Sequence, residues 1–126
     1  MRPNDMRLLV LAGLMAASPA VAATGGEAKL EKALAGKVAG KPVDCIRPDL
    51  SARPEIYDSA GIIYRDARIT YVARMQGACP ALREDRTVVV RGVGGQICRN
   101  DPVRIVESTG STFGFCTFAG FTPYTK

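Results

Sequence analysis

Residues 61–74 of the chain read GIIYRDARITYVAR, and this stretch indicates the fold class. Its two ends are rich in Ile, Tyr, Val and Thr, residue types that are enriched in β-strands. Between them, residues 65–68 (RDAR) can form the turn that joins Ile63 to Ile69. The sequence therefore predicts a hairpin of two antiparallel strands, over residues 61–65 and 69–74.

Similar short runs of β-forming residues continue on both sides of this hairpin. The expected strands cover residues 55–58, 61–65, 69–74, 87–91, 95–98, 103–107 and 112–118. Residues 92–95 (GVGG) supply the positive-φ positions of a second hairpin turn, and residues 108–111 form a third turn. Because no helical pattern separates these runs, we expect a mainly β fold: a small antiparallel barrel or sandwich of six to seven short strands in a meander.

Alternation along these strands selects the side chains expected to share one core. Each is apolar or aromatic and lies within one of the expected strands. The candidates are Ile62, Tyr64, Ile69, Tyr71, Val88, Val90, Ile97, Val103, Ile105, Phe113 and Phe115.

Three further rings lie near the end of the chain: Phe118, Phe121 and Tyr124. We expect them to form an exposed contact patch, because aromatic rings provide a large contact area at a small entropic cost. The alternative interpretation is that the same rings cover the base of the barrel.

Residues 1–22 have the pattern of a signal peptide. Arg2 and Arg7 precede an apolar stretch over residues 8–17, and residues 20–22 (AVA) are small enough for the cleft of a signal peptidase. The apolar stretch is shorter than the roughly 20 residues that span a bilayer, so we expect cleavage after residue 22 and no transmembrane segment in the mature protein. The expected location is periplasmic or secreted, and the alternative is an uncleaved membrane anchor.

Residues 23–43 differ in composition from the rest of the mature chain. Thr24 and Glu27 fit a capping box at the start of a helix. Apolar residues then recur at a helical spacing, at Leu30, Ala33, Leu34 and Val38. We expect a short, frayed and weakly packed helix that ends before Pro42, and the alternative is a mobile spacer.

Cys45, Cys79, Cys98 and Cys116 are the four cysteines of a chain directed to an oxidising compartment, which predicts two disulfides. The absence of any C-x-x-C pair argues against a zinc site and against a thioredoxin-like redox pair. Three connectivities are possible, and we favour Cys45 with Cys79 and Cys98 with Cys116, because each pair lies within a local unit of strands. Residues 44–126 then form a disulfide-stapled β-domain.

The composition excludes several classes of chemistry. The chain has no histidine, so histidine metal ligands and histidine-activated nucleophiles are excluded. Residues 87–95 resemble the strand and glycine turn of a dinucleotide site, but the third glycine of that pattern would fall on Ile97, so we expect no bound cofactor. Residues 99–102 (RNDP) lack the calcium-loop pattern, so we expect no metal site. Glu84 and Asp85 keep a small carboxylate-dependent hydrolase as the alternative function.

The net charge is +5 for the whole chain, and removal of residues 1–22 leaves 15 basic and 11 acidic residues, or +4. Arg65 and Arg68 flank Asp66 rather than joining a basic stripe, so we expect no nucleic-acid partner. An envelope protein or an envelope surface is the partner class that fits the compartment. These observations favour a non-catalytic binding or accessory module of the periplasm.

Three motifs contain three of the cysteines: C-P-x-L at residues 79–82, I-C-x-x-D at residues 97–101, and C-x-x-x-G-F-x-P-Y at residues 116–124. Together they resemble a domain-of-unknown-function family of small exported bacterial proteins, in which all four cysteine positions match. The chain departs from the family at Ala81, where glycine is usual, and near Ala73, where asparagine is frequent. The resemblance implies a periplasmic or secreted β-rich domain with paired cysteines, and it brings no catalytic residue.

Overall fold

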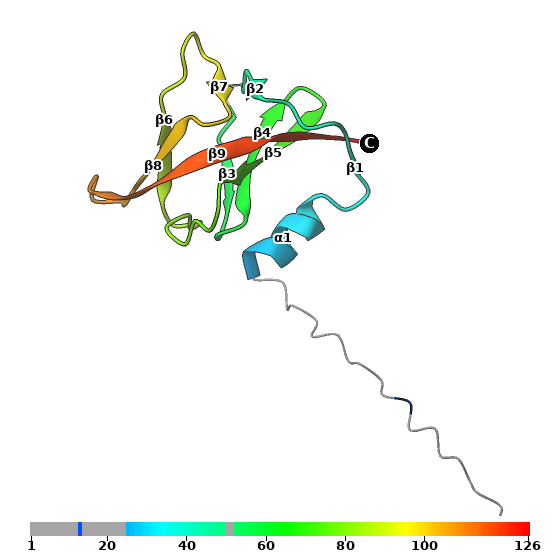
Figure 1. Ribbon diagram of the computed structural model, residues 1–126, viewed down its shortest axis with the longest axis horizontal. Coiled ribbons are helices and arrows are strands. Elements are labelled where there is room, and N and C mark those ends of the chain that lie inside the picture. The colour runs from blue at the N-terminus through cyan, green and yellow to red at the C-terminus, as the bar shows by residue number, and fades with distance from the viewer. Residues whose placement is uncertain (1–12, 14–24, 50–51) are drawn as a thin grey trace, which may run out of the picture.

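A computed structural model describes residues 13, 25–49 and 52–126, and in it a curled antiparallel sheet lies against one helix (Figure 1). The mainly β class predicted from the sequence is confirmed. Apart from Gly13, the expected signal peptide lies outside the described residues, and so does Thr24 of the expected capping box.

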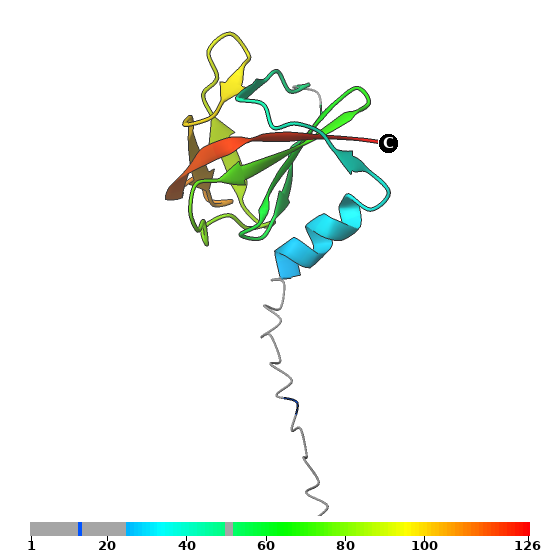
Figure 2. The same cartoon turned by 45° about the vertical axis from the view of Figure 1, so that its right-hand side comes forward.

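The main sheet has seven strands, in the order β3-β4-β5-β9-β8-β6 with β1 beside β9. Their bounds are Val38–Ala39 (β1), Glu55–Tyr57 (β3), Gly61–Asp66 (β4), Ile69–Met75 (β5), Thr87–Val90 (β6), Pro102–Val106 (β8) and Thr112–Thr125 (β9). A second, two-stranded sheet pairs β2 (Cys45–Ile46) with β7 (Ile97–Cys98). All pairs are antiparallel, and together they form a half-barrel whose curl is visible in Figure 2.

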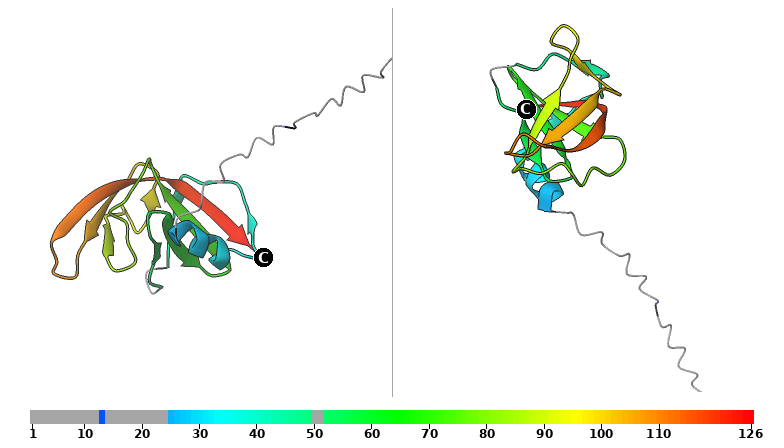
Figure 3. Two further views of the ribbon diagram at one scale, coloured as in Figure 1. Left: turned by 90° about the horizontal axis from the view of Figure 1, so that it is seen from below. Right: turned by 90° about the vertical axis from the view of Figure 1, so that its left-hand side faces the viewer.

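Strand β9 changes the topology from the expected meander. It is 14 residues long, and its first half pairs with β8 while its second half pairs with β5. A strand that was expected to end at Phe118 therefore continues to Thr125 and lies between β5 and β8. Figure 3 shows β9 as an arc, with the β8–β9 hairpin at one end and the C-terminus at the other.

Both faces of the sheet are covered at β4, β5 and β9, which explains four consecutive buried residues at 61–64. The main core fills the inside of the curl, and its buried members are Ile46, Ile62, Tyr64, Ala73, Cys79, Leu82, Ile97, Val103, Ile105, Phe118 and Phe121. A second cluster lies between the sheet and the helix, and its buried members are Leu30, Ala60, Ile63 and Val72. The alternation of side chains along the strands was expected to select one core. It instead divides the apolar residues between two clusters, one on each face of the sheet.

Helix α1 (Gly25–Ala33) is packed, so the expectation of a frayed and weakly packed segment is wrong. Leu30 is completely buried in the second cluster. A Cβ atom at Gly26 would lie 1.9 Å from the backbone oxygen of Asp58, so the absence of a side chain there allows the helix to approach the sheet closely. The helix ends well before Pro42, because Gly36 adopts a φ of 77° and the chain then enters β1.

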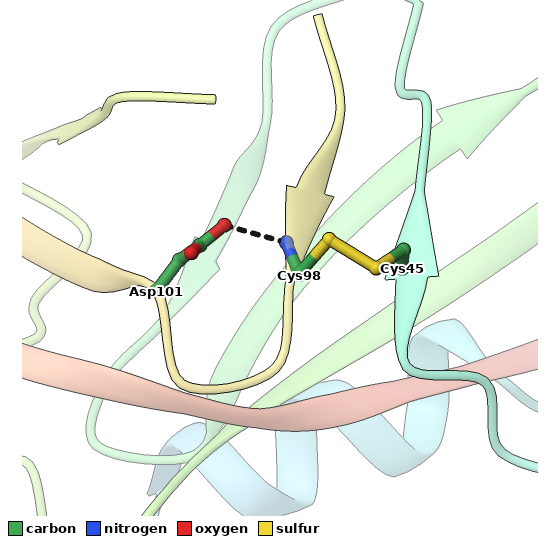
Figure 4. The surroundings of a disulfide bond; sticks show 3 residues. All are labelled: Cys45, Cys98 and Asp101. Atoms are coloured by element: carbon green, nitrogen blue, oxygen red, sulfur yellow. Dashed lines mark hydrogen bonds between the residues drawn. A yellow bond between two sulfur atoms is a disulfide. The ribbon is translucent and has the colours of Figure 1, made fainter. Parts of the chain in front are cut away.

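The two predicted disulfides are present, but the favoured pairing is wrong. Cys45 and Cys98 lie directly opposite each other on β2 and β7 and are bonded, with their Cα atoms 4.0 Å apart (Figure 4). Cys79 is bonded to Cys116, with a Cα separation of 6.1 Å. The local units assumed from the sequence do not form, because β9 returns beside β5 and brings Cys116 to the turn that contains Cys79.

The close approach of Gly26 to the backbone of Asp58 predicts that an alanine at this position destabilises the fold. Gly26→Ala should lower the free energy of unfolding by roughly 1–3 kcal/mol, because the added methyl group must displace the backbone of Asp58. Gly25→Ala is the matched control, since nothing lies within 4 Å of its Cβ position. Equal stability of the two variants in urea denaturation would contradict the docking of α1.

Both disulfides should contribute strongly to stability. Replacing Cys79 and Cys116 together by alanine should lower the free energy of unfolding by about 4 kcal/mol in the chain-entropy model, because the bridge constrains a long loop of the unfolded chain. Replacing Cys45 and Cys98 should have an effect of similar size. Urea denaturation of the two variants gives the values, and non-reducing peptide mapping of the parent protein checks the pairing. Peptides that link Cys45 to Cys79 would refute it.

Candidate functional site

The three rings of the expected contact patch are not an exposed surface. Phe118 and Phe121 are fully buried in the main core, where their ring centroids are 5.1 Å apart. A register shift between them, where β9 pairs with β5, turns both rings to the same face. Tyr124 is half-buried and packs against the cluster under α1. The predicted patch is wrong for the two phenylalanines, and the alternative, in which the rings cover the core, agrees with their burial.

The exposed rings of β9 are Phe113 and Phe115, both of which were expected in the core. Their exposed fractions are 51% and 67%. Cys116 turns inward because it is bonded to the buried Cys79, and the side chain of its neighbour Phe115 therefore points to the opposite face of the strand. Phe113 lies at a register shift between β8 and β9, which removes it from the alternation.

Phe115 belongs to a row of outward-facing residues that crosses three strands. Val89 on β6 is the register partner of Arg104 on β8, and Arg104 is the partner of Phe115 on β9. These side chains border a hollow of about 260 Å³, which we call the Phe115 hollow. Its lining residues are Val89, Arg91, Pro102, Arg104 and Phe115.

Two guanidinium groups give the Phe115 hollow its charge. No acidic residue lines it, and within the described parts of the chain the guanidinium groups of Arg91 and Arg104 make no hydrogen bond and no ion pair. Free guanidinium groups bind carboxylates through paired, charge-assisted hydrogen bonds. The hollow can therefore hold a carboxylate next to an apolar or planar group.

Phe113 has a different environment, although it lies on the same strand. The guanidinium carbon of Arg86 lies 3.4 Å from the centre of the Phe113 ring, in a cation–π contact. Arg86 also donates a hydrogen bond of 2.8 Å to the carbonyl oxygen of Ala81, and it lies 4.0 Å from a carboxylate oxygen of Glu107. Phe113 and Arg86 thus stabilise the β8–β9 hairpin and leave the Phe115 hollow as the free aromatic surface.

The acids considered for a hydrolase lie in solvent. Glu84 and Asp85 are exposed, and Glu84 forms an ion pair with Lys29 at 3.2 Å. A glycosidase-type mechanism needs two carboxyl groups in a concave site, one of which has its pKa raised by burial. None of the acidic residues that the structure describes is buried. No observation therefore favours the hydrolase.

The glycine-rich segment at residues 92–95 (GVGG) forms a tight turn. Val93 and Gln96 face each other across Gly94 and Gly95, whose φ angles are 64° and 76°. The predicted turn is present, but it lies in the connection to β7 and does not join paired strands, because β6 pairs with β8.

A separate hollow of about 680 Å³ lies beside the β4–β5 turn and is lined by basic residues. Its charged residues are Lys37, Arg65, Arg68 and Lys126. Arg65 is already paired with Glu55 at 3.1 Å, Lys37 is half-buried, and Arg68 and Lys126 are exposed. No aromatic residue lines this hollow, unlike the Phe115 hollow.

In residues 25–49 and 52–126, no group of three or more acidic or cysteine side chains is placed to hold a metal ion. The helix that the structure describes is too short to cross a membrane.

Comparison of the chain with protein-family models, with curated proteins and with solved structures finds no match.

Sequence reasoning missed the residues of the Phe115 hollow because it placed Phe115 in the core and assigned no role to Arg91 or Arg104. One feature could have corrected this: a disulfide requires Cys116 to face inward, and the residues next to it on a strand must then face outward.

The opposite environments of Phe115 and Phe118 predict opposite effects of mutation. Phe115→Thr should change the free energy of unfolding by less than about 1 kcal/mol, because the ring is exposed and threonine suits a strand. Phe118→Ala should lower it by roughly 3–5 kcal/mol, because the ring is fully buried. Thermal or urea denaturation gives both values, and a large loss for Phe115→Thr would place that ring in the core.

Proposed function

We propose that the chain is a non-catalytic binding module of the periplasm or of the cell exterior. Its partner is an envelope protein that carries acidic residues, and its contact surface is the Phe115 hollow. The observation that carries the proposal is the presence of a largely exposed ring beside two arginines that no described acid neutralises.

The energetics of the hollow support binding. An exposed ring gains free energy when a partner covers it, and aromatic and arginine side chains are enriched among the residues that dominate interfaces. Phe115 is adjacent to Cys116, whose bond to Cys79 restrains this part of β9, so the partner does not have to order the strand that carries the ring.

The compartment is supported by two independent features. Residues 1–22 have the three-part pattern of a signal peptide. The two disulfides are typical of proteins outside the reducing cytoplasm.

Membership of the exported domain-of-unknown-function family is part of this proposal. Its support is the match of the cysteine-bearing motifs, and two of these motifs contain the partners of the buried bridge, Cys79 and Cys116. The family resemblance agrees with a binding role, since it implies no catalytic residue.

A capture experiment tests the proposed contact surface. The exported protein is immobilised, exposed to periplasmic extract of a bacterium that produces it, and compared with the Phe115→Ala/Arg104→Ala double variant. The double variant should recover a specific partner at least about tenfold less well, because it loses both the ring and one guanidinium group.

The matched control is Val93→Ala/Arg99→Ala, which changes one apolar and one basic residue that are exposed and lie outside the hollow. It should recover the partner as the parent protein does. Equal recovery by all three proteins would remove the Phe115 hollow from the proposal.

A further inference from the structure

The half-barrel has two end strands, β3 and β6. Among the described residues, no strand pairs with the outer edge of either one. Alternate backbone N–H and C=O groups at such an edge have no ladder partner, which makes the edge a template for a further strand. The edge of β6 is formed by Thr87–Val90.

A second hollow, of about 490 Å³, lies between these two edges. We call it the inter-edge hollow, and it is lined by Arg53, Pro54 and Ile56 on the β3 side and by Glu84, Arg86, Thr87 and Val88 on the β6 side. Ile56 and Val88 are only partly buried, and both pack against the main core. The inter-edge hollow therefore borders the main core at these two partly buried side chains.

Strand β6 thus has a hollow on each of its faces. The inter-edge hollow lies on the inner side with Val88, and the Phe115 hollow lies on the outer side with Val89. Successive side chains of a strand point to opposite faces, so a strand added to β6 would place its outward side chains beside Val89, at the border of the Phe115 hollow, and its inward side chains beside Val88, in the inter-edge hollow. An acidic side chain in the outer set would face Arg91, the residue after β6, and would reach across β6 toward Arg104 on β8.

The edge of β3 is less suitable. Its Glu55 is paired with Arg65, and the hydroxyl group of Tyr57 donates a hydrogen bond to the same carboxylate. Burial and the nearby Glu55 charge raise the pKa of Tyr57, so this group stays neutral and keeps that hydrogen bond well above neutral pH. No unpaired charge is left on β3 to select a partner.

We propose that an extended segment of a partner protein adds to the edge of β6 as a new strand and closes the gap in the half-barrel. The segment has acidic residues at alternate positions, which face Arg91 and Arg104, and apolar residues between them, which cover Ile56 and Val88. This inference rests on the proposed binding function and specifies the conformation and sequence pattern of the partner.

Charge distinguishes this partner from a second copy of the chain. No acidic residue lines the Phe115 hollow, so a second copy of the chain paired antiparallel along β6 would bring no carboxylate of that hollow to face Arg91 or Arg104. An acidic segment neutralises the same groups.

Selection from a display library of random twelve-residue peptides tests the inference with the parent protein as bait. The enriched peptides should contain acidic residues at alternate positions with apolar residues between them. On addition of a synthetic enriched peptide, hydrogen exchange of backbone amides should slow in residues 87–90 and remain unchanged in residues 55–57. Methylation of alternate peptide nitrogens should abolish binding, because it removes the ladder donors.

Matched variants test the role of charge. Arg91→Ser/Arg104→Ser should weaken binding of the enriched peptide at least about tenfold. Arg68→Ser/Arg99→Ser, which removes two exposed arginines outside both hollows, should change it less than about twofold.

Protection of other residues, binding that tolerates the methylated peptide, or dimerisation of the free protein would each overturn strand addition. Failure of the library to yield any binder would also overturn it. These outcomes are separable from failure of the proposed function, because the capture experiment with the Phe115→Ala/Arg104→Ala variant does not depend on how the partner is folded.

Discussion

The bond between Cys79 and Cys116 determines which way the side chains of β9 point. Because Cys79 is buried, Cys116 must face the inside of the curl, and Phe118, two residues further along, faces inward as well. Phe115 is then directed to solvent by the same alternation. One covalent contact thus places a fully buried ring of the core and the exposed ring of the candidate site on opposite faces of a single strand.

The double coverage of the sheet determines where such a surface can exist. At β4 and β5 the outer face is closed by α1, and Leu30 and Ile63 pack there without exposure to solvent. The helix does not extend over β6 and β8, and the outer face remains open where Arg104 lies. Apolar area is therefore buried on both faces of one half of the sheet, whereas the other half keeps one face free for contact with other molecules.

The sequence predicted local features better than long-range ones. The hairpin over residues 61–74 was predicted because strand-forming residues and a short turn are adjacent in the chain. The pairing of β5 with β9 was not predicted from the sequence. About 45 residues separate the paired positions along the chain, and no local sequence pattern encodes a contact between them. The disulfide pairing was predicted wrongly for the same reason. Phe115 was misplaced because simple alternation was applied without the constraint from Cys116, and α1 was underestimated because its stability comes from the contact of Leu30 with the sheet.

The position of β9 in the sheet also has a consequence for biosynthesis. A chain made from its N-terminus presents β3, β4, β5, β6 and β8 before β9, which pairs with both β5 and β8, has been completed. Until the 14 residues of β9 emerge, the two halves of the sheet have no common strand, and the nascent polypeptide keeps apolar edges open. A product that terminates before β9 therefore lacks the strand that joins the two halves of the sheet.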